Sequence, residues 1–335
     1  MTGAVEAASL SNWTPIGFKC GPEGTLVEWI NLGHADFVEP FFFETINKHL
    51  AQSGKTAESE ILTTGPEVLC QLPQRATCLE PSGFIFHASR CGSTLLANAL
   101  KAPADHLVLS EPRPLNQLLG SPLRHQAPDI WRQLFLATVA ALGQPRRPGQ
   151  QHYFVKFSSH AIQQIPAIRG AFPRVPWLFL YRHPLEILVS ALRKPTGWLR
   201  LYDQAAIAQP LLGFTPEEFA TLTRESFAVE VLRRFFVSAR QALDQSESKS
   251  LCLSYEQLSP ETLPAIFAAL GHQIDGESLR LAGNFFAHHS KEGGKTTFQE
   301  DSAEKQAVAG PALRALFHDR LEEPFQALEL LRLSL

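Results

Sequence analysis

From Gly83 onward the chain alternates short apolar runs with longer amphipathic stretches, and this alternation limits its fold more than any other feature. The apolar runs, which we expect to be strands, lie at 84–87, 106–109, 153–157, 177–181 and 251–254. The expected helices lie at 94–101, 130–142, 185–193, 216–242, 263–270 and 310–333. Short strands that alternate with helices form parallel sheets covered by helices. The sequence therefore predicts an α/β fold: a three-layer sandwich around a central, mostly parallel sheet.

Residues 1–82 do not follow this alternation. They contain Phe41, Phe42 and Phe43 in a row, and Pro66 and Pro73 exclude a long helix at their end. We interpret 1–82 as an N-terminal accessory lobe, helical or mixed, whose role the sequence does not indicate. The three phenylalanines are expected in its core. The remainder, 83–335, is predicted to be the α/β domain, which agrees with about two domains for 335 residues at ~150 residues per domain.

The charge and cysteine content narrow the class of protein. Thirty Lys and Arg against 33 Asp and Glu give a net charge of −3, which disfavours a nucleic-acid-binding or membrane-coating protein but allows a local anion site. The five cysteines form no C-x-x-C pair, so we expect neither a disulfide framework nor a zinc site, and we expect a reducing, cytoplasmic location. The sequence shows no signal peptide and no apolar stretch of ~18 residues, so no membrane span is expected. It does not indicate an oligomeric state.

A loop of small residues connects the first expected strand to the first expected helix. It contains Arg90, Gly92, Ser93 and Thr94. Backbone N–H groups at a helix start are unpaired and carry the positive end of the helix dipole, Gly92 permits close approach, and the hydroxyls and Arg90 add donors. This chemistry suits a phosphate or sulfate group. The loop lacks the Lys of the G-x-x-x-x-G-K-[ST] motif, which disfavours nucleoside triphosphate hydrolysis. The alternative is that Ser93 or Thr94 merely caps the helix.

A second loop follows the expected strand at 177–181. It reads Arg182-His183-Pro184, and Ser190 comes eight positions after Arg182, just over two helical turns later. An arginine fork and a hydroxyl at this spacing can face one phosphate.

Together the two loops resemble those of the sulfotransferase family that uses 3′-phosphoadenosine 5′-phosphosulfate (PAPS), in its bacterial-type or tyrosylprotein-type branch. The resemblance covers about 83–300 and implies a P-loop-like fold. It also implies a cradle for the 5′-phosphosulfate at Arg90, Cys91, Gly92, Ser93, Thr94 and Leu95, and a 3′-phosphate site at Arg182 and Ser190. One departure is the loop sequence Ser-Arg-Cys-Gly-Ser-Thr, where many members have Pro-Lys-Ser-Gly-Thr-Thr or Pro-Arg-Ser-Gly-Thr-Thr.

Two later segments extend the resemblance. Tyr255-Glu256-Gln257-Leu258 is similar to the Tyr-Glu-x-Leu that ends a late strand in the family, which adds Tyr255 to the expected nucleotide contacts. The family's Arg-Lys-Gly segment is not present as such. Lys291 and Lys295 lie roughly where it would be and are expected to take its place.

The resemblance offers two candidates for the general base. Glu111 and Arg113 have the Glu-x-Arg spacing of the tyrosylprotein-type branch, in which the Glu is the base and the Arg supports it. Lys156 and His160 are similar to the Lys-Thr-His of the cytosolic branch, although His160 comes two residues later than in that pattern. We expect Glu111 to be the base, with His160 as the alternative and Lys156 to stabilise the leaving oxygen.

The resemblance therefore implies a sulfotransferase that needs no metal and acts on a hydroxyl or amine of a small-molecule or carrier-bound acceptor. A nucleotide-dependent small-molecule kinase or phosphotransferase is the first alternative. A catalytically silent sulfotransferase-like binding protein is the second. Two further sets of arginines have simpler expected roles. Arg146 and Arg147 are expected in an exposed loop. The second set lies along one helix and is expected to be either solvated or bordering the acceptor site: Arg224, Arg233, Arg234 and Arg240.

Overall fold

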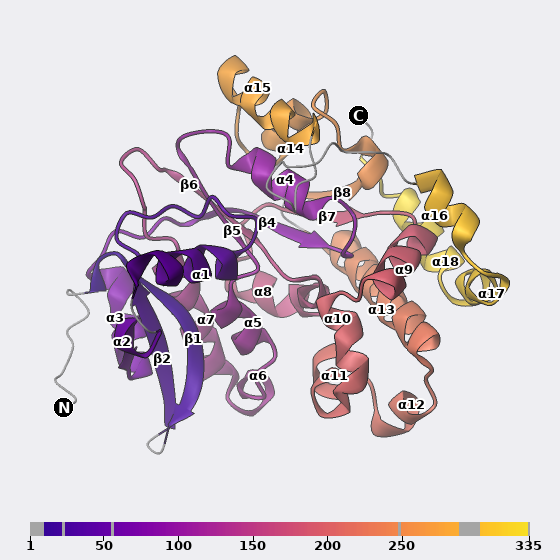
Figure 1. The fold of residues 1–335 in the computed structure, drawn as a ribbon, viewed down its shortest axis with the longest axis horizontal. Coiled ribbons are helices and arrows are strands. Elements are labelled where there is room, and N and C mark those ends of the chain that lie inside the picture. The colour runs from indigo at the N-terminus through magenta and orange to yellow at the C-terminus, as the bar shows by residue number, and fades with distance from the viewer. Residues whose placement is uncertain (1–9, 22–23, 55–56, 247–248, 288–301, 334–335) are drawn as a thin grey trace. The chain divides into compact units, whose positions relative to one another are not determined.

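The computed structural model describes residues 10–21, 24–54, 57–246, 249–287 and 302–333, and it shows an α/β protein (Figure 1). Within these residues one sheet has five strands in the order β5-β6-β4-β7-β8. The pairs β5–β6, β4–β7 and β7–β8 are parallel. The predicted α/β class with a parallel central sheet flanked by helices is confirmed. The strands are β4 (Pro81–His87), β5 (His106–Ser110), β6 (His152–Lys156), β7 (Trp177–Tyr181) and β8 (Ser250–Ser254).

The predicted strand positions agree with these bounds to within three residues. All residues of β5 and β7 are buried, as expected for uninterrupted apolar runs covered on both faces. The pairing of β4 with β7 places Phe86 opposite Phe179 and His87 opposite Leu180. The loops that follow β4 and β7 therefore begin side by side.

The chain forms two compact units. The first comprises Met1–Gly83 and Ala97–Phe157, and the second comprises Phe84–Leu96 and Ser158–Leu335. Helix α4 (Ser93–Leu100) belongs in part to each.

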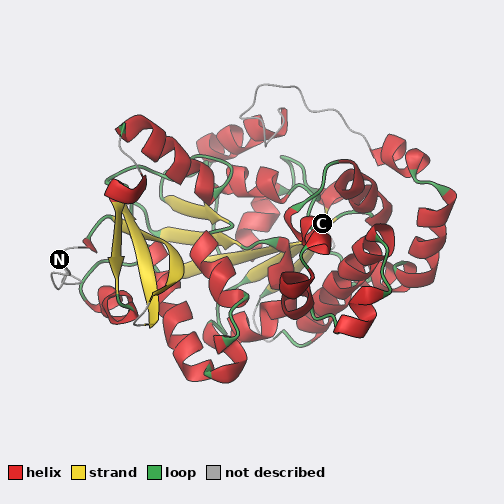
Figure 2. Cartoon of the chain, turned by 60° about the horizontal axis from the view of Figure 1, so that its bottom comes forward, coloured by secondary structure: helices red, strands yellow, loops and turns green. Residues whose placement is uncertain are grey.

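An antiparallel sheet with the order β1-β2-β3 lies in the first unit (Figure 2). The sequence predicted only a helical or mixed lobe there. The indole Nε1 of Trp29 in β2 donates to Thr64 Oγ1 of β3 at 2.9 Å, inside the core. Helices α5 and α7 contact β1. The elements of this unit are β1 (Trp13–Gly21), β2 (Gly24–Asn31), α1 (Phe42–Ser53), α2 (Ala57–Glu60), β3 (Ile61–Thr64), α3 (Pro66–Gln71), η2 (Leu72–Gln74), α5 (Arg113–Leu119), α6 (Leu123–Gln126) and α7 (Pro128–Leu142).

Arg146 corrects the expectation of an exposed loop after α7. Its side chain is fully buried in the first unit. The guanidinium donates to the Asn12 carbonyl at 3.1 Å and to Thr14 Oγ1, and its Cζ lies 5.5 Å from the centre of the Phe37 ring. A buried arginine needs such partners because an unsatisfied guanidinium is costly. The loop therefore fastens the start of β1.

The second unit is built around helix α13 (Arg224–Asp244), which packs against α9 (Pro184–Arg193), α17 (Pro311–Arg320) and α18 (Glu322–Glu329) (Figure 1). Among the described residues, no helix combines the length and the apolar character that crossing a membrane requires. The other elements of this unit are η3 (Ser159–Gln164), α8 (Ile165–Ala171), α10 (Gly197–Arg200), η4 (Leu201–Asp203), α11 (Ala205–Leu212), α12 (Pro216–Ala220), η5 (Tyr255–Gln257), α14 (Leu263–Ala269), α15 (Gly276–Asn284), η6 (Phe285–Ala287) and α16 (Ser302–Val308).

Two long helices predicted from the sequence are each divided in two. The helix expected at 216–242 ends at Ala220 and restarts at Arg224, because Thr223 acts as a new N-cap and its Oγ1 accepts from the N–H of Ser226. The helix expected at 310–333 is divided at Leu321. Pro324 lies in the first turn of α18, where the N–H that it lacks would have no partner within the helix.

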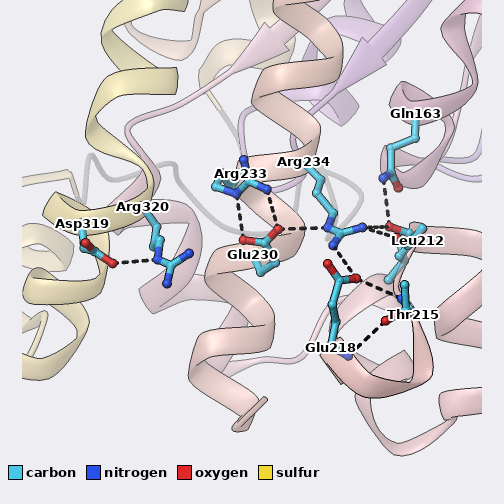
Figure 3. Close-up of polar contacts among 10 residues, drawn as sticks. Gln163, Leu212, Thr215, Glu218, Glu230, Arg233, Arg234, Asp319 and Arg320 are labelled. Atoms are coloured by element: carbon cyan, nitrogen blue, oxygen red, sulfur yellow. Dashed lines mark hydrogen bonds and ion pairs between the residues drawn. The ribbon is translucent and has the colours of Figure 1, made fainter. Parts of the chain in front are cut away.

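Arg233 and Arg234 on α13 are committed to contacts within the second unit (Figure 3). Arg233 makes a bidentate pair with Glu230, at 2.7 and 2.8 Å, and Arg234 Nε donates to the same carboxylate at 3.0 Å. Arg234 also donates to the carbonyls of Leu212 and Gly213, at the end of α11. Arg234 therefore links α13 to the end of α11, and Arg233 shares the Glu230 carboxylate with it.

We predict that Arg234→Met lowers the free energy of unfolding by about 1–2 kcal/mol, because the Gly213 carbonyl loses its Arg234 donor. The Leu212 carbonyl keeps its hydrogen bond from Gln163, and the partly buried Glu230 carboxylate keeps its pair with Arg233. Arg320→Met is the matched control, since Arg320 pairs with Asp319 at an exposed position, at 2.7 Å. Loss of that pair is expected to cost less than about 0.5 kcal/mol. Urea denaturation of both variants measures the difference. Equal costs would contradict the role assigned to Arg234.

Candidate functional site

The loop after β4 makes a sharp left-handed turn. Ser89 has a φ of 68°, Arg90 of 53° and Gly92 of 81°. Glycine adopts this conformation readily, whereas for Ser89 and Arg90 it is a local strain that the surroundings must maintain. Local contacts do so: the N–H of Ser89 donates to His87 Nδ1 at 3.0 Å, and Cys91 Sγ donates to the Leu180 carbonyl of β7 at 3.1 Å. Cys91 is one of the residues expected to contact the nucleotide. In the structure its thiol connects the loop to β7.

Helix α4 begins directly after this turn. Its first intrahelical bond runs from the N–H of Leu96 to the carbonyl of Gly92, at 3.0 Å. The N–H groups of Ser93, Thr94 and Leu95 therefore stand at the helix N-terminus, at the positive end of its dipole. N–H groups placed in this way suit an anion, which is the role that the sequence analysis expects for them.

Gly92 lies against the loop after β8. A Cβ built on Gly92 would come 2.9 Å from Cδ2 of the Tyr255 ring, so only glycine fits there without movement. The same ring lies against Arg182, whose Cζ is 4.3 Å from the ring centre, within cation–π range. Gly92, Tyr255 and Arg182, which follow three different strands, are therefore neighbours.

Arg182 is buried together with Glu186. Its Nε donates to Glu186 Oε2, and the other carboxylate oxygen accepts from Gln306 Nε2 at 2.7 Å. Both members of the ion pair are almost inaccessible to solvent. The guanidinium is consequently held in one orientation by a carboxylate at one edge and a ring at its face.

Arg90 connects the loop after β4 to helix α9. Its guanidinium donates to the backbone carbonyl of Ser190 at 3.4 Å. The sequence assigned Arg90 to the 5′ end of a nucleotide and Ser190 to the 3′ end. The structure places them in contact, within the second unit.

Glu111 and Lys156 form an ion pair in the first unit, at the ends of β5 and β6. Lys156 Nζ donates to Glu111 Oε1, and the N–H of Glu111 donates to the Lys156 carbonyl at 2.7 Å. Lys156 is fully buried, whereas the Glu111 side chain is 28% exposed. Glu111 also has a left-handed φ, of 58°. The carboxylate is therefore the solvent-facing member of a pair that a strained backbone holds in place.

Arg113 and His160 are the two remaining residues that were predicted to be catalytic. Arg113 is largely exposed and forms an ion pair with Glu28 of β2, in the antiparallel sheet, at 3.9 Å. His160 is half-buried in η3 of the second unit. Lys291 and Lys295 lie outside the described residues. Within the part of the chain that is described, no three His, Cys, Asp or Glu residues are grouped so that they could hold a metal ion.

Three residues beside these clusters were not predicted from the sequence. Glu186 could have been identified, because an acid four residues after Arg182 on a helix is a standard ion-pair spacing. Phe41, whose ring centre lies 5.1 Å from Lys156 Nζ, and Lys101, whose Nζ donates to the Glu39 carbonyl at 2.5 Å, could not. These contacts join segments that are far apart in the sequence.

Comparisons with known proteins return only structural matches. No protein-family model and no curated protein matches the sequence. Among solved structures, the chain is similar to a sulfotransferase domain from the curacin biosynthetic pathway, at 15% identity and a TM-score of 0.45, over 72% of this chain and 98% of that one. It is also similar to sulfotransferase STF9 from Mycobacterium avium, at 14% identity and a TM-score of 0.42, over 75% of this chain and 78% of that one. A third similar structure is sulfotransferase STF1 from Mycobacterium tuberculosis H37Rv, at 13% identity and a TM-score of 0.42, over 76% of this chain and 82% of that one. A fold does not by itself define a reaction, which depends on the side chains of the site.

We predict that Gly92→Ala lowers the free energy of unfolding by about 2–4 kcal/mol, from left-handed strain and from the clash with Tyr255. Gly271→Ala is the matched control, because Gly271 has a φ of 87° and a Cβ added there would meet nothing within 4 Å. That variant should cost only about 1 kcal/mol. Chemical denaturation measures both. Equal losses would show that Tyr255 yields and does not constrain the loop.

Lys101 gives a pH prediction. Burial, and then the charge of Lys156, lower its pKa from 10.5 to about 8, against the opposing effect of Asp36, Glu39 and Glu44. The unfolded chain therefore binds more protons than the folded chain between pH 8 and 10.5, and the Lys101 contribution to stability rises with pH across that window.

The free energy of unfolding of the wild type, minus that of Lys101→Met, should increase by on the order of 2 kcal/mol from about pH 7.5 to about pH 10. Urea denaturation at the two pH values measures this difference, in which the titration of groups that do not interact with Lys101 cancels. A difference that stays constant or falls would contradict the buried position of the ammonium.

Proposed function

We propose that this chain is a sulfotransferase that moves a sulfuryl group from PAPS to a hydroxyl or amine of a small-molecule or carrier-bound acceptor. The observation that supports it most is the convergence of the loops after β4, β7 and β8. Arg90 contacts Ser190 at 3.4 Å, and the ring of Tyr255 lies against both the Gly92 position and Arg182. Groups suited to two anionic ends of one nucleotide are thus assembled in a single unit.

The two ends would be held by different chemistry. The N–H groups and hydroxyls at the start of α4, with Arg90, suit the 5′-phosphosulfate, because a helix N-terminus favours an anion. Arg182, fixed by Glu186, would offer its fork to the 3′-phosphate together with the Ser190 hydroxyl. Bound PAPS supplies an activated sulfuryl group, so the protein needs no covalent nucleophile of its own.

Glu111 is our proposed general base. Its carboxylate is the accessible member of the pair with Lys156, and it can take the proton that the acceptor hydroxyl must lose. Once Glu111 is protonated, the Lys156 ammonium loses the opposing charge of that carboxylate. It is then available to stabilise the negative charge that develops on the leaving oxygen. Backbone strain at Glu111, as at Arg90, is typical of a functional position.

Thermal unfolding with 3′-phosphoadenosine 5′-phosphate tests the donor site. We expect the wild-type Tm to rise by about 5 °C at millimolar nucleotide, by ligand linkage. Arg182→Ala should remove most of that rise. Because it leaves Glu186 buried without its partner, Arg182→Gln combined with Glu186→Gln is the variant that removes both charges together.

Arg320→Gln controls for the loss of one positive charge at an exposed site and should keep the full rise in Tm. Absence of any rise in the wild type would overturn the donor assignment. A larger rise with ATP and Mg²⁺ than with the bisphosphate would favour the kinase alternative.

Turnover measurements test the base. Glu111→Gln should keep the nucleotide-induced rise in Tm but lose at least about 100-fold in the rate of labelled sulfate transfer to acceptors of a cell extract. His160→Gln should keep the rate. The reverse result would make His160 the base. Nucleotide binding by the wild type without any sulfated product would favour the silent binding protein.

A further inference from the structure

An aromatic surface lies beside the Glu111–Lys156 pair, in the first unit. The ring centre of Phe41 is 5.1 Å from Lys156 Nζ, and the same Nζ donates to Glu111. The ring of Phe43 stacks on that of Phe41, with centroids 5.9 Å apart and an angle of 19° between the planes. Two stacked rings therefore extend outward from the ion pair.

Core packing accounts for only half of the aromatic residues in this segment. Phe37 and Phe42 stack on each other at 5.3 Å and are 4% and 2% exposed. Phe43, by contrast, is 54% exposed, and the nearby Val38 is 62% exposed. The expectation that residues 41–43 form a core cluster is therefore correct for Phe42 and wrong for Phe43. Apolar exposure gathered on one short segment is typical of a recognition surface.

The segment is held in place by polar contacts on both sides of Pro40. Lys101 Nζ donates to the Glu39 carbonyl at 2.5 Å, and the Glu39 carboxylate pairs with Lys48 at 2.5 Å. The N–H of Phe41 donates to Glu44 Oε2 at 3.2 Å, at the start of α1. A surface fixed before binding loses little conformational entropy when a ligand arrives.

We propose that Phe41 and Phe43 select the acceptor, and that the acceptor carries its hydroxyl close to an aromatic ring. The ring would continue the Phe41–Phe43 stack, and the hydroxyl would reach the exposed carboxylate of Glu111. A flat ring is favoured over a saturated one, because ring pairs gain from stacked geometry beyond the area that they bury. The proposal rests on the proposed role of Glu111 and gives the N-terminal lobe a function in specificity.

The test uses 2-phenylethanol and 2-cyclohexylethanol, which are both primary alcohols with the same carbon skeleton. Calorimetry or ligand-observed NMR with the full chain and 3′-phosphoadenosine 5′-phosphate measures Kd for each. We expect the wild type to bind the aromatic alcohol about 3–10-fold more tightly. Phe41→Leu, which keeps an apolar side chain, should bring the ratio close to one, and Phe43→Leu should lower it.

Phe285→Leu is the matched control, since Phe285 is an exposed phenylalanine on η6 of the second unit, and it should keep the wild-type ratio. A wild-type ratio near one, no binding of either alcohol, or an unchanged ratio in Phe41→Leu would overturn the proposal. The rise in Tm with the bisphosphate is measured for each variant and reports separately on folding and on the donor site. A preserved aromatic preference without that rise would refute the donor assignment alone.

Discussion

Arg182 is held from two sides, and the arrangement of the candidate nucleotide site depends on how it is held. Glu186 fixes one edge of its guanidinium, and the ring of Tyr255 covers its face. A buried ion pair of this kind offsets its own charge, so Arg182 contributes a fixed direction of hydrogen bonding more than net positive charge. Tyr255 in turn touches the position of Gly92, which makes the loop after β4 dependent on the same contacts.

Backbone strain is concentrated in loops that follow strands of the parallel sheet. Four residues other than glycine have a left-handed φ in the described part of the chain. Three of them, Ser89, Arg90 and Glu111, closely follow a strand of the parallel sheet. Loops at the carboxyl ends of such strands are where α/β proteins bind ligands. Hydrogen bonds to neighbouring strands maintain this strain. The N–H of Glu111 donates to the Lys156 carbonyl of β6, and Cys91 Sγ donates to the Leu180 carbonyl of β7.

Local patterns predicted the elements well where the pattern was continuous. The apolar run at 177–181 has the same bounds as β7. All five of its residues are buried, as expected for a strand that is covered on both faces of the sheet. Prediction was wrong where one contact outweighed the pattern. Thr223 ends the continuous helix expected at 216–242, and Arg146, polar and flanked by prolines, is buried because Asn12 and Thr14 supply its partners from 132 to 134 residues away.

The sequence by itself determined the strands of the parallel sheet, most of the helices that connect them and the chemical character of the loops. These features depend on periodicity and residue type within a few neighbouring positions. It also indicated Arg90, Arg182 and Glu111 as candidates. Only the tertiary structure decided their partners: Ser190 for Arg90, Tyr255 for Arg182 and Lys156 for Glu111. Only the tertiary structure shows that Phe43 is exposed while Phe42 is buried. The three pairings depend on contacts between segments that are distant in the sequence. The exposure of Phe43 and the burial of Phe42 depend on which face of the first turn of α1 packs against the core.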